Sequence, residues 1–351
     1  MSPLSRRSVL SGVPTVAATT ALTSSRPGPA QEVRMTWFGI SNWHYQIGDL
    51  GILVDGAVGY PAREPDPDMV RRVRTALALK GGTVDHIFLG HQHPDHSVDT
   101  REWARATGAP LVASQAACEE AVAYGVPRGQ CVPVKGGEVL HLDKHVEVHV
   151  LKWVHSVEAG QSSGPDGGIE TFGFLFKIRT PRKILTLFMS DSGAGGPELV
   201  KEHIVAGENR GAPLSNLGHA LEAAGLSTFD VWQPGPESRL VTQARVLVPA
   251  FRPAYVMPHH IGARGGFNLL GGLHYAFDPA EMPKFMSVLD AFEVPLLAPV
   301  NYFDAWVYDH RGVRATDNAT VKTSLGLPAA GPGPNPQGPN PRAGELEGPD
   351  D

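Results

Sequence analysis

One segment in the first third of the chain constrains both the fold and the chemistry more than any other. Residues 83–99 read TVDHIFLGHQHPDHSVD and place four potential metal ligands within six positions: His91, His93, Asp95 and His96. A short apolar run before them ends at Gly90, which is the pattern of a buried strand that stops at a glycine. The four polar side chains are therefore expected on a loop just beyond a strand end.

Pro94 lies inside this predicted loop and cannot extend a β-ladder, because proline has a fixed φ and no backbone N–H. Successive imidazoles are then free to turn toward one point instead of alternating between the two faces of a sheet. Neutral imidazole and carboxylate are ligands that suit zinc. The segment predicts a metal site, and the alternative is a solvated loop that happens to be rich in histidine.

The pattern His-x-His-x-Asp-His after an apolar strand resembles the signature of the metallo-β-lactamase-fold hydrolases. The resemblance implies an α/β fold, a four-layer αβ/βα sandwich of two mixed sheets with helices outside and a site at one edge. Short strands interleaved with helices also fit two packed mixed sheets. The opening Trp-Phe-Gly at 37–39 and Pro-His-His-Ile-Gly at 258–262 look closest to the lactonase and phosphodiesterase-like branch.

Three further positions resemble the family's remote ligands. His155 ends an apolar strand and is followed by a serine, like the third histidine of the family. Asp191 begins Asp-Ser-Gly, which is similar to the motif that carries the aspartate bridging two metals. His260 stands where the family motif Pro-x-His-x-Gly has its last histidine, and His259 stands at the variable position, so we prefer His260 as the ligand.

Carried over residue by residue, the resemblance divides the ligands between two ions. The first ion is assigned His91, His93 and His155, the second Asp95, His96 and His260, and Asp191 bridges them. It implies two Zn²⁺ per chain, with Mn²⁺ or Fe²⁺ as alternatives. Two such ions lower the pKa of a bridging water toward neutrality. Asp95 is the predicted catalytic residue, because it can ligate, orient the resulting hydroxide or accept its proton.

The predicted function is an exported, binuclear zinc-dependent hydrolase that directs a metal-bound hydroxide at an ester, lactone, amide or phosphodiester bond of a small-molecule substrate. One alternative is a di-iron redox enzyme of the same fold, a branch in which glutamate commonly replaces the residue at His93 and a flavin domain often follows. Another is a metal-holding binding protein without turnover.

The two ends of the chain differ from its centre in amino-acid composition. Ser-Arg-Arg-Ser-Val-Leu at 5–10, an Ala/Thr-rich stretch and a small-residue site near residue 30 resemble a twin-arginine export signal. We expect residues 1–30 to be a signal peptide and the protein to be periplasmic or extracellular. Two arginines by chance in a disordered start are the alternative. Residues 31–325 form the predicted domain, and the Pro/Gly-rich residues 326–351 are expected to be disordered.

The composition of the chain bears on which kinds of molecule the protein binds. The 30 basic and 36 acidic residues give a net charge of −6 without a basic run beyond the start, which disfavours nucleic-acid binding. No stretch reaches the ~18–20 apolar residues of a membrane span. Cys118 and Cys131 either form a disulfide or are two separate buried thiols.

Several segments away from the motif are also predicted. Residues 192–227 are expected to be helical with irregular joints, and strands are expected at 294–299 and 305–309. We expect substrate choice to depend on loops at 43–45, 160–168, 193–226 and 264–275, where His44 in particular belongs to a hairpin that could overhang the site.

Overall fold

The computed structural model of the chain describes residues 30–59, 62–155, 169–190, 195–205, 207–235, 239–260, 282–299 and 301–329. The predicted signal peptide and C-terminal tail lie almost entirely outside these residues, as do the predicted loops at 160–168 and 264–275. Within the described parts of the chain, no helix combines the length and apolar character needed to cross a membrane.

The first sheet is mixed and contains eight strands among the described residues. Their spatial order is β16 (Gly312–Thr316), β15 (Asp304–Asp309), β1 (Val33–Trp37), β2 (Trp43–Ile47), β3 (Leu50–Val54), β4 (His86–Phe88), β5 (Leu111–Ala113) and β6 (Cys131–Pro133). Strands β3 to β6 pair in parallel, and the others pair antiparallel. The predicted central strand before Gly90 is β4.

The second sheet is also mixed. Its described strands follow the order β14 (Tyr255–Val256), β13 (Val231–Gln233), β10 (Ile184–Ser190), β9 (Glu170–Arg179), β8 (Val146–Val154) and β7 (Val139–His141). Strand β9 is antiparallel to both β8 and β10, whereas β13 and β14 are parallel to β10. Strands β8, β10, β13 and β14 therefore all run in the same direction.

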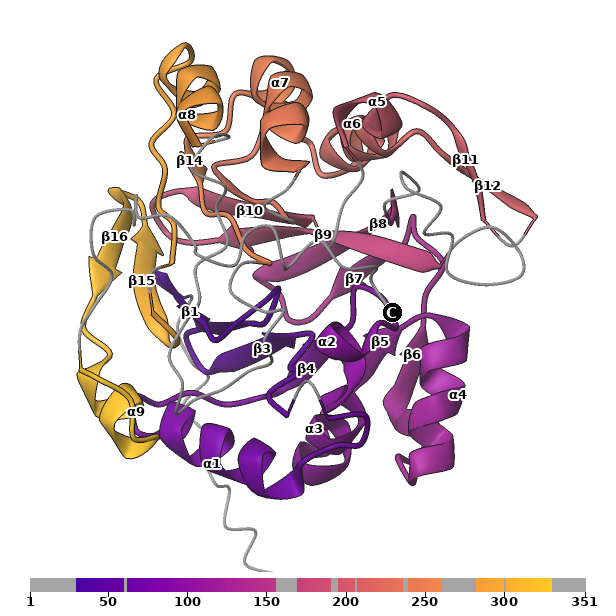
Figure 1. Cartoon of the computed structure of the whole chain (residues 1–351), viewed down its shortest axis with the longest axis vertical. Coiled ribbons are helices and arrows are strands. Elements are labelled where there is room, and N and C mark those ends of the chain that lie inside the picture. Colours follow the sequence, from indigo (N-terminus) through magenta and orange to yellow (C-terminus); the bar gives the residue numbers. More distant parts are fainter. Residues whose placement is uncertain are drawn as a thin grey trace, which may run out of the picture.

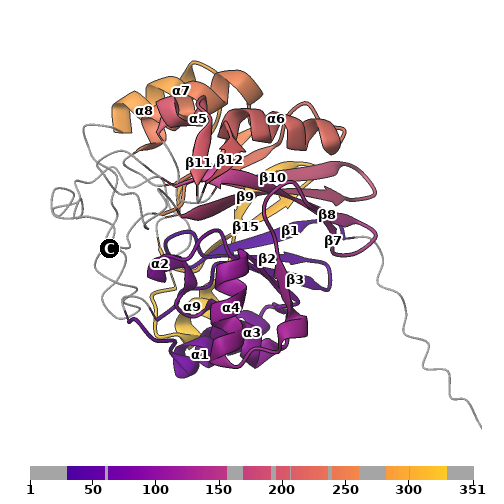
Figure 2. The ribbon, with the colours of Figure 1, turned by 90° about the vertical axis from the view of Figure 1, so that its right-hand side faces the viewer.

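Helices cover the outer faces of both sheets (Figures 1 and 2). On the first sheet lie α1 (Pro67–Ala78), α3 (Thr100–Thr107), α4 (Gln115–Tyr124) and α9 (Ala319–Ser324), with a 3₁₀ turn at Arg128–Gln130. On the second lie α5 (Gly196–Leu199), α6 (Pro213–Ala223), α7 (Leu240–Phe251) and α8 (Met282–Asp290). Figure 2 shows the four layers in profile, and this confirms the predicted αβ/βα sandwich.

Aromatic side chains fill the space between the sheets. Phe88 of β4 packs edge-on against Phe174 and Phe176 of β9, with ring centroids 5.2 and 5.9 Å apart. Tyr45 of β2 contacts Phe176 at 5.3 Å. Such pairs add about 0.5–1.5 kcal/mol each beyond the burial of their apolar area. Strand β4, which precedes the metal-ligand motif, is therefore held in place by its own sheet and by aromatic contacts with the second sheet.

Local sequence signals explain α1. The Asp66 side chain accepts hydrogen bonds from the backbone N–H groups of Asp68 and Met69, and Pro67 occupies the first helical position. An aspartate at the N-cap followed by proline in the first turn is a favourable start for a helix. Val73 and Leu77 face the core at helical spacing, so the amphipathic pattern sets the orientation of the helix on the sheet.

Parts of the second half differ from the sequence-based prediction. The segment expected to be helical contains a hairpin instead, β11 (His203–Val205) and β12 (Glu208–Gly211), between α5 and α6. The strand expected at 294–299 is reduced to one bridge between Val256 and Leu296, whereas the strand expected at 305–309 is present as β15. These short segments have weak periodicity, and their conformation depends on the neighbours they pack against.

The two cysteines are neighbours but carry free thiols. Cys118 of α4 is buried, and the Cys131 sulfur on β6 lies 3.7 Å from the Cys118 carbonyl oxygen. Burial raises the pKa of the Cys118 thiol to about 12. Both side chains therefore act as small apolar groups between α4 and β6 in this structure.

The prediction that His44 overhangs the site is wrong, because residues 43–45 form the buried strand β2. His44 is only 2% exposed, and its Nε2 lies 2.6 Å from the carbonyl oxygen of Thr83, at the start of the segment that leads into β4. A carbonyl only accepts, so Nε2 carries the proton. Burial lowers the pKa of His44 to about 4, although the bond to Thr83 opposes this shift.

This environment predicts an acid-sensitive contribution of His44 to stability. The folded pKa lies below the usual value, so the unfolded chain takes up a proton first, and stability is lost as the pH falls below about 6.5. Between pH 7 and 5 the His44 contribution should fall by about 2 kcal/mol. Urea unfolding of the metal-free wild type and of His44→Phe, at pH 7 and at pH 5, measures this change in the free energy of unfolding. Equal pH dependence in the two proteins would contradict the assignment.

Candidate metal centre

The predicted site residues follow strands that end at the same edge of the sandwich. The ligand motif follows β4, His155 follows β8, and His260 lies four residues beyond β14. A backbone hydrogen bond from Phe172 N to Gly90 O, 2.9 Å long, ties the start of β9 to the glycine before the motif. Ligands from both sheets therefore meet where the two sheets are joined.

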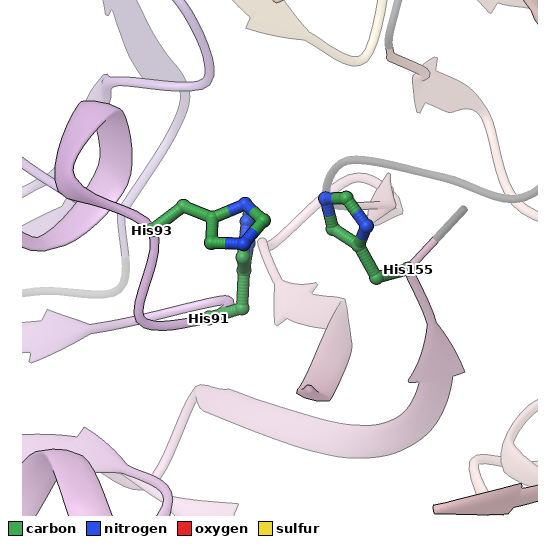
Figure 3. A group of neighbouring side chains, drawn as sticks. All are labelled: His91, His93 and His155. Carbon is green, nitrogen blue, oxygen red and sulfur yellow. The ribbon is translucent and has the colours of Figure 1, made fainter. Parts of the chain in front are cut away.

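Three histidines form the first cluster. His91, His93 and His155 each place one ring nitrogen within 4.8 Å of the others. Figure 3 shows the rings turned toward one another, His91 and His93 from the loop after β4 and His155 from the end of β8. Ring centroids are 4.6 Å apart for His91–His93, 4.9 Å for His91–His155 and 4.6 Å for His93–His155. The arrangement brings together all three residues that the sequence assigned to the first ion.

Asp95, His96 and His260 form the second cluster, again with ligand atoms within 4.8 Å of one another. The Asp95 Oδ2 atom lies 3.5 Å from His96 Nε2 and 3.3 Å from His260 Nε2. The ring centroids of His91 and His96 are only 4.0 Å apart, so the two clusters are adjacent. All six of the predicted ligands that the structure describes are therefore grouped as the sequence divided them.

The motif itself is not wholly an irregular loop. Residues Pro94–Ser97 form the one-turn helix α2, with His93 in the N-cap position. The backbone N–H of His96 donates to the His93 carbonyl oxygen at 2.9 Å. Proline suits the first turn of a helix because its missing N–H would be unsatisfied there in any case. This turn separates His93, which faces the first cluster, from His96, which faces the second.

The electrostatics of the second cluster favour an ionised Asp95. Burial alone would raise the pKa of its carboxyl group, but the charge of His96 and the hydrogen bond and charge of His260 together hold that pKa well below its usual range. A carboxylate that stays charged among imidazoles is a suitable ligand for a divalent cation.

Two buried residues that were not predicted from the sequence contact His96. Asp55 follows β3, and its Oδ2 lies 2.7 Å from His96 Nδ1 with both side chains fully buried. Ser41 Oγ lies 2.6 Å from the same nitrogen and donates to Asp55 Oδ2. A bond at Nδ1 fixes the ring and directs Nε2 into the cluster. The available signal was an aspartate directly after a buried strand.

Two other predicted positions have different outcomes. Asp191, the predicted bridging ligand, lies outside the described residues. His259 is described, and it is not a member of either cluster. Its Nδ1 accepts a hydrogen bond from Trp43 Nε1 at 3.2 Å, and its Nε2 lies 2.8 Å from the Ser190 carbonyl oxygen. Of these two neighbouring histidines, the structure places His260 in the second cluster.

A sandwich of this type with two His/Asp clusters at one edge defines a metallo-β-lactamase-like fold with a candidate metal centre. The chain is 27% identical over 228 residues to a UPF0173 metal-dependent hydrolase from Pyrobaculum calidifontis, covering 65% of this chain and 84% of that protein. It is 25% identical over 267 residues to the homologous protein of Pyrobaculum islandicum, covering 76% and 97% of the two chains. No family model matches the chain.

Among solved structures, the metallo hydrolase Igni18 from Ignicoccus hospitalis superposes with a TM-score of 0.49 at 17% sequence identity, covering 79% of this chain and 99% of Igni18. The class predicted from the sequence, a metal-dependent hydrolase, is confirmed by the relatives named above.

The Asp55 contacts generate a prediction for the metal-free protein. Asp55 has φ +61°, a left-handed conformation that asparagine tolerates well, so Asp55→Asn changes the charge with little backbone strain. The amide would place an N–H₂ group against the donors that now bond the carboxylate. We expect a loss of about 2–4 kcal/mol in the free energy of unfolding, measured with urea.

Asp68→Asn is the matched control. Asp68 is an exposed carboxylate whose ion pair with Arg71 lies on the surface, and its replacement should change stability by less than about 0.5 kcal/mol. If Asp55→Asn is no more destabilising than Asp68→Asn, the carboxylate of Asp55 does not have the role assigned to it.

Proposed function

We propose that the protein is a binuclear, zinc-dependent hydrolase that cleaves an ester, lactone, amide or phosphodiester bond in a small molecule. The observation that carries the proposal is the pair of adjacent three-residue clusters, one of three histidines and one of an aspartate and two histidines. The relatives named as metal-dependent hydrolases support the general activity. Zinc and the number of ions are our inference from the ligands, and the bond type is our inference from the family that the ligand motif resembles.

The donor set suits two divalent ions. Three imidazoles converge in one cluster, and one carboxylate with two imidazoles converges in the other. Nitrogen-rich sites with three protein ligands are typical of catalytic zinc, which leaves a coordination position for water or substrate. Asp191 is the proposed bridging ligand on the strength of its sequence motif.

When bound, such a pair of ions would supply Lewis acidity and an activated water molecule. The residues of the chain would hold the ions in place and orient the water molecule. His91, His93 and His155 hold one position, and the buried His96 holds the other because Asp55 fixes its ring. Asp95 stays ionised, so it can accept a hydrogen bond from a water molecule and orient it toward the substrate.

The experiment combines metal analysis with a substrate screen on one sample. The wild type should contain about two zinc ions per chain and hydrolyse at least one member of an ester, lactone, amide and phosphodiester panel. His93→Ala and Asp191→Ala should each lower turnover by more than about 10³-fold, since removing a ligand disturbs the pair of ions. Chelation should abolish turnover, and zinc should restore it.

Four results would contradict the proposal. Fewer than one metal ion per chain, or full turnover in both alanine variants, would remove the metal centre from the reaction. Stoichiometric iron with redox activity would favour the di-iron alternative. Two bound ions without turnover on any of the four substrate classes would favour a metal-holding binding protein.

Export is a separate part of the proposal and is supported by the twin-arginine-like start of the chain. Wild-type protein should appear outside the cytoplasm with an N-terminus near residue 31. A variant with Arg6→Lys and Arg7→Lys should stay in the cytoplasm at full length, because that route reads the arginine pair. Cell fractionation with N-terminal sequencing measures the location and the processing of each protein. Identical distributions of the wild type and the variant would contradict export by this route.

A further inference from the structure

His259 lies directly before the proposed ligand His260 and is completely buried. Both of its ring nitrogens have hydrogen-bond partners. Trp43 Nε1 can only donate, so the Nδ1 atom of His259 that accepts from it carries no proton. The Ser190 carbonyl can only accept, so His259 Nε2 carries the proton. The ring is therefore a neutral imidazole in one tautomer, and both nitrogens are engaged with the protein.

The partners of His259 connect it to separate strands. Ser190 is the last residue of β10, and Asp191 follows it directly in the sequence. Trp43 begins β2, where its indole stacks on Tyr45 with centroids 6.2 Å apart and contacts Trp306 at 6.0 Å. His259 therefore connects the end of β10 and the start of β2 to the segment that follows β14.

The adjacent backbone is held in an unfavourable conformation. His260 has φ +58°, which costs a residue other than glycine roughly 1–2 kcal/mol. Its backbone N–H donates to the Ile40 carbonyl oxygen at 2.8 Å. Such a conformation persists only where the surroundings fix it, and here it sets the direction of a proposed ligand. The His260 Nε2 atom reaches within 3.3 Å of Asp95 Oδ2.

The backbone of Gly235 packs directly against His259 and His260. A Cβ atom at this position would lie 2.6 Å from His259 Cδ2 and 2.8 Å from His260 Cβ. The Gly235 carbonyl accepts a hydrogen bond from Gln243 Nε2 at 2.8 Å, which anchors this backbone to α7. The His259 ring is thus hydrogen-bonded at both nitrogens and packed against glycine backbone, so it has little freedom to reorient.

We propose that His259 is a positioning residue for the second metal ion. By bonding to Trp43 and Ser190 it fixes the left-handed backbone at His260 and aims that ligand at Asp95. The first cluster has no ligand on this segment and does not depend on it. The inference rests on the proposed two-ion site and adds that the affinity for one ion, but not the other, is set by a residue that binds neither.

The test is zinc titration of the metal-free full-length protein by calorimetry, with metal content measured on the same samples. His259→Phe keeps an aromatic ring but removes both hydrogen bonds. It should retain one tightly bound zinc per chain, while the dissociation constant of the second rises by about 10–100-fold, the usual effect of removing a residue that orients a ligand.

Two further variants separate positioning from general damage to the fold. His259→Gln keeps an amide N–H that can reach the Ser190 carbonyl, so it should recover most of the second-ion affinity. Trp43→Phe removes the donor to Nδ1 together with part of the ring contact with Tyr45 and Trp306, and should weaken the second ion by an intermediate factor. If His259→Phe does not fold, these two variants still test whether His259 positions the ligand of the second metal ion.

His44→Phe is the matched control, because His44 is a buried, hydrogen-bonded histidine next to Trp43 whose partner Thr83 lies away from the clusters. It should bind both ions as the wild type does. The inference is overturned if His259→Phe keeps both ions at wild-type affinity or loses both equally, and, should His259→Phe not fold, if Trp43→Phe binds the second ion as tightly as the wild type does. A wild type that binds fewer than two zinc ions would instead refute the proposed function.

Discussion

The fully buried carboxylate of Asp55 is the interaction on which the candidate centre most depends. It accepts hydrogen bonds from Ser41 Oγ and from the backbone N–H of Gly90, and it contacts His96 Nδ1. It thereby joins the segment after β1, the glycine before the ligand motif and one of the ligands. A carboxyl group with no exposure to water is stable only when partners within the protein replace its hydrogen bonds to water. The site is therefore built around a fully buried carboxyl group whose partners are all supplied by the chain.

The rest of the fold places the remaining ligands around this group. Aromatic contacts of Phe88 with Phe174 and Phe176 fix β4 against β9, and the bond from Phe172 to Gly90 closes the sandwich next to the motif. The strands that carry ligands run with their carboxyl ends toward this edge, so side chains distant in sequence converge without long loops. His259 then determines how the last ligand enters the second cluster.

The sequence predicted the parts of the site that depend on local spacing. The His91–His96 motif and the strand before His155 follow from short patterns, and the resemblance supplied the ligands at distant strand ends. Ser41, Asp55 and the role of His259 were not predicted, because their function depends on which strand ends meet in space. The β11–β12 hairpin was missed for the related reason that short segments take their conformation from packing.

The central claim is that the six clustered side chains hold two ions. A crystal structure of the zinc-loaded protein, with anomalous data collected at the zinc edge, tests it directly. We expect two peaks about 3.5–4 Å apart, one bonded to His91, His93 and His155 and the other to Asp95, His96 and His260. A single peak, or peaks bonded to other residues, would contradict it.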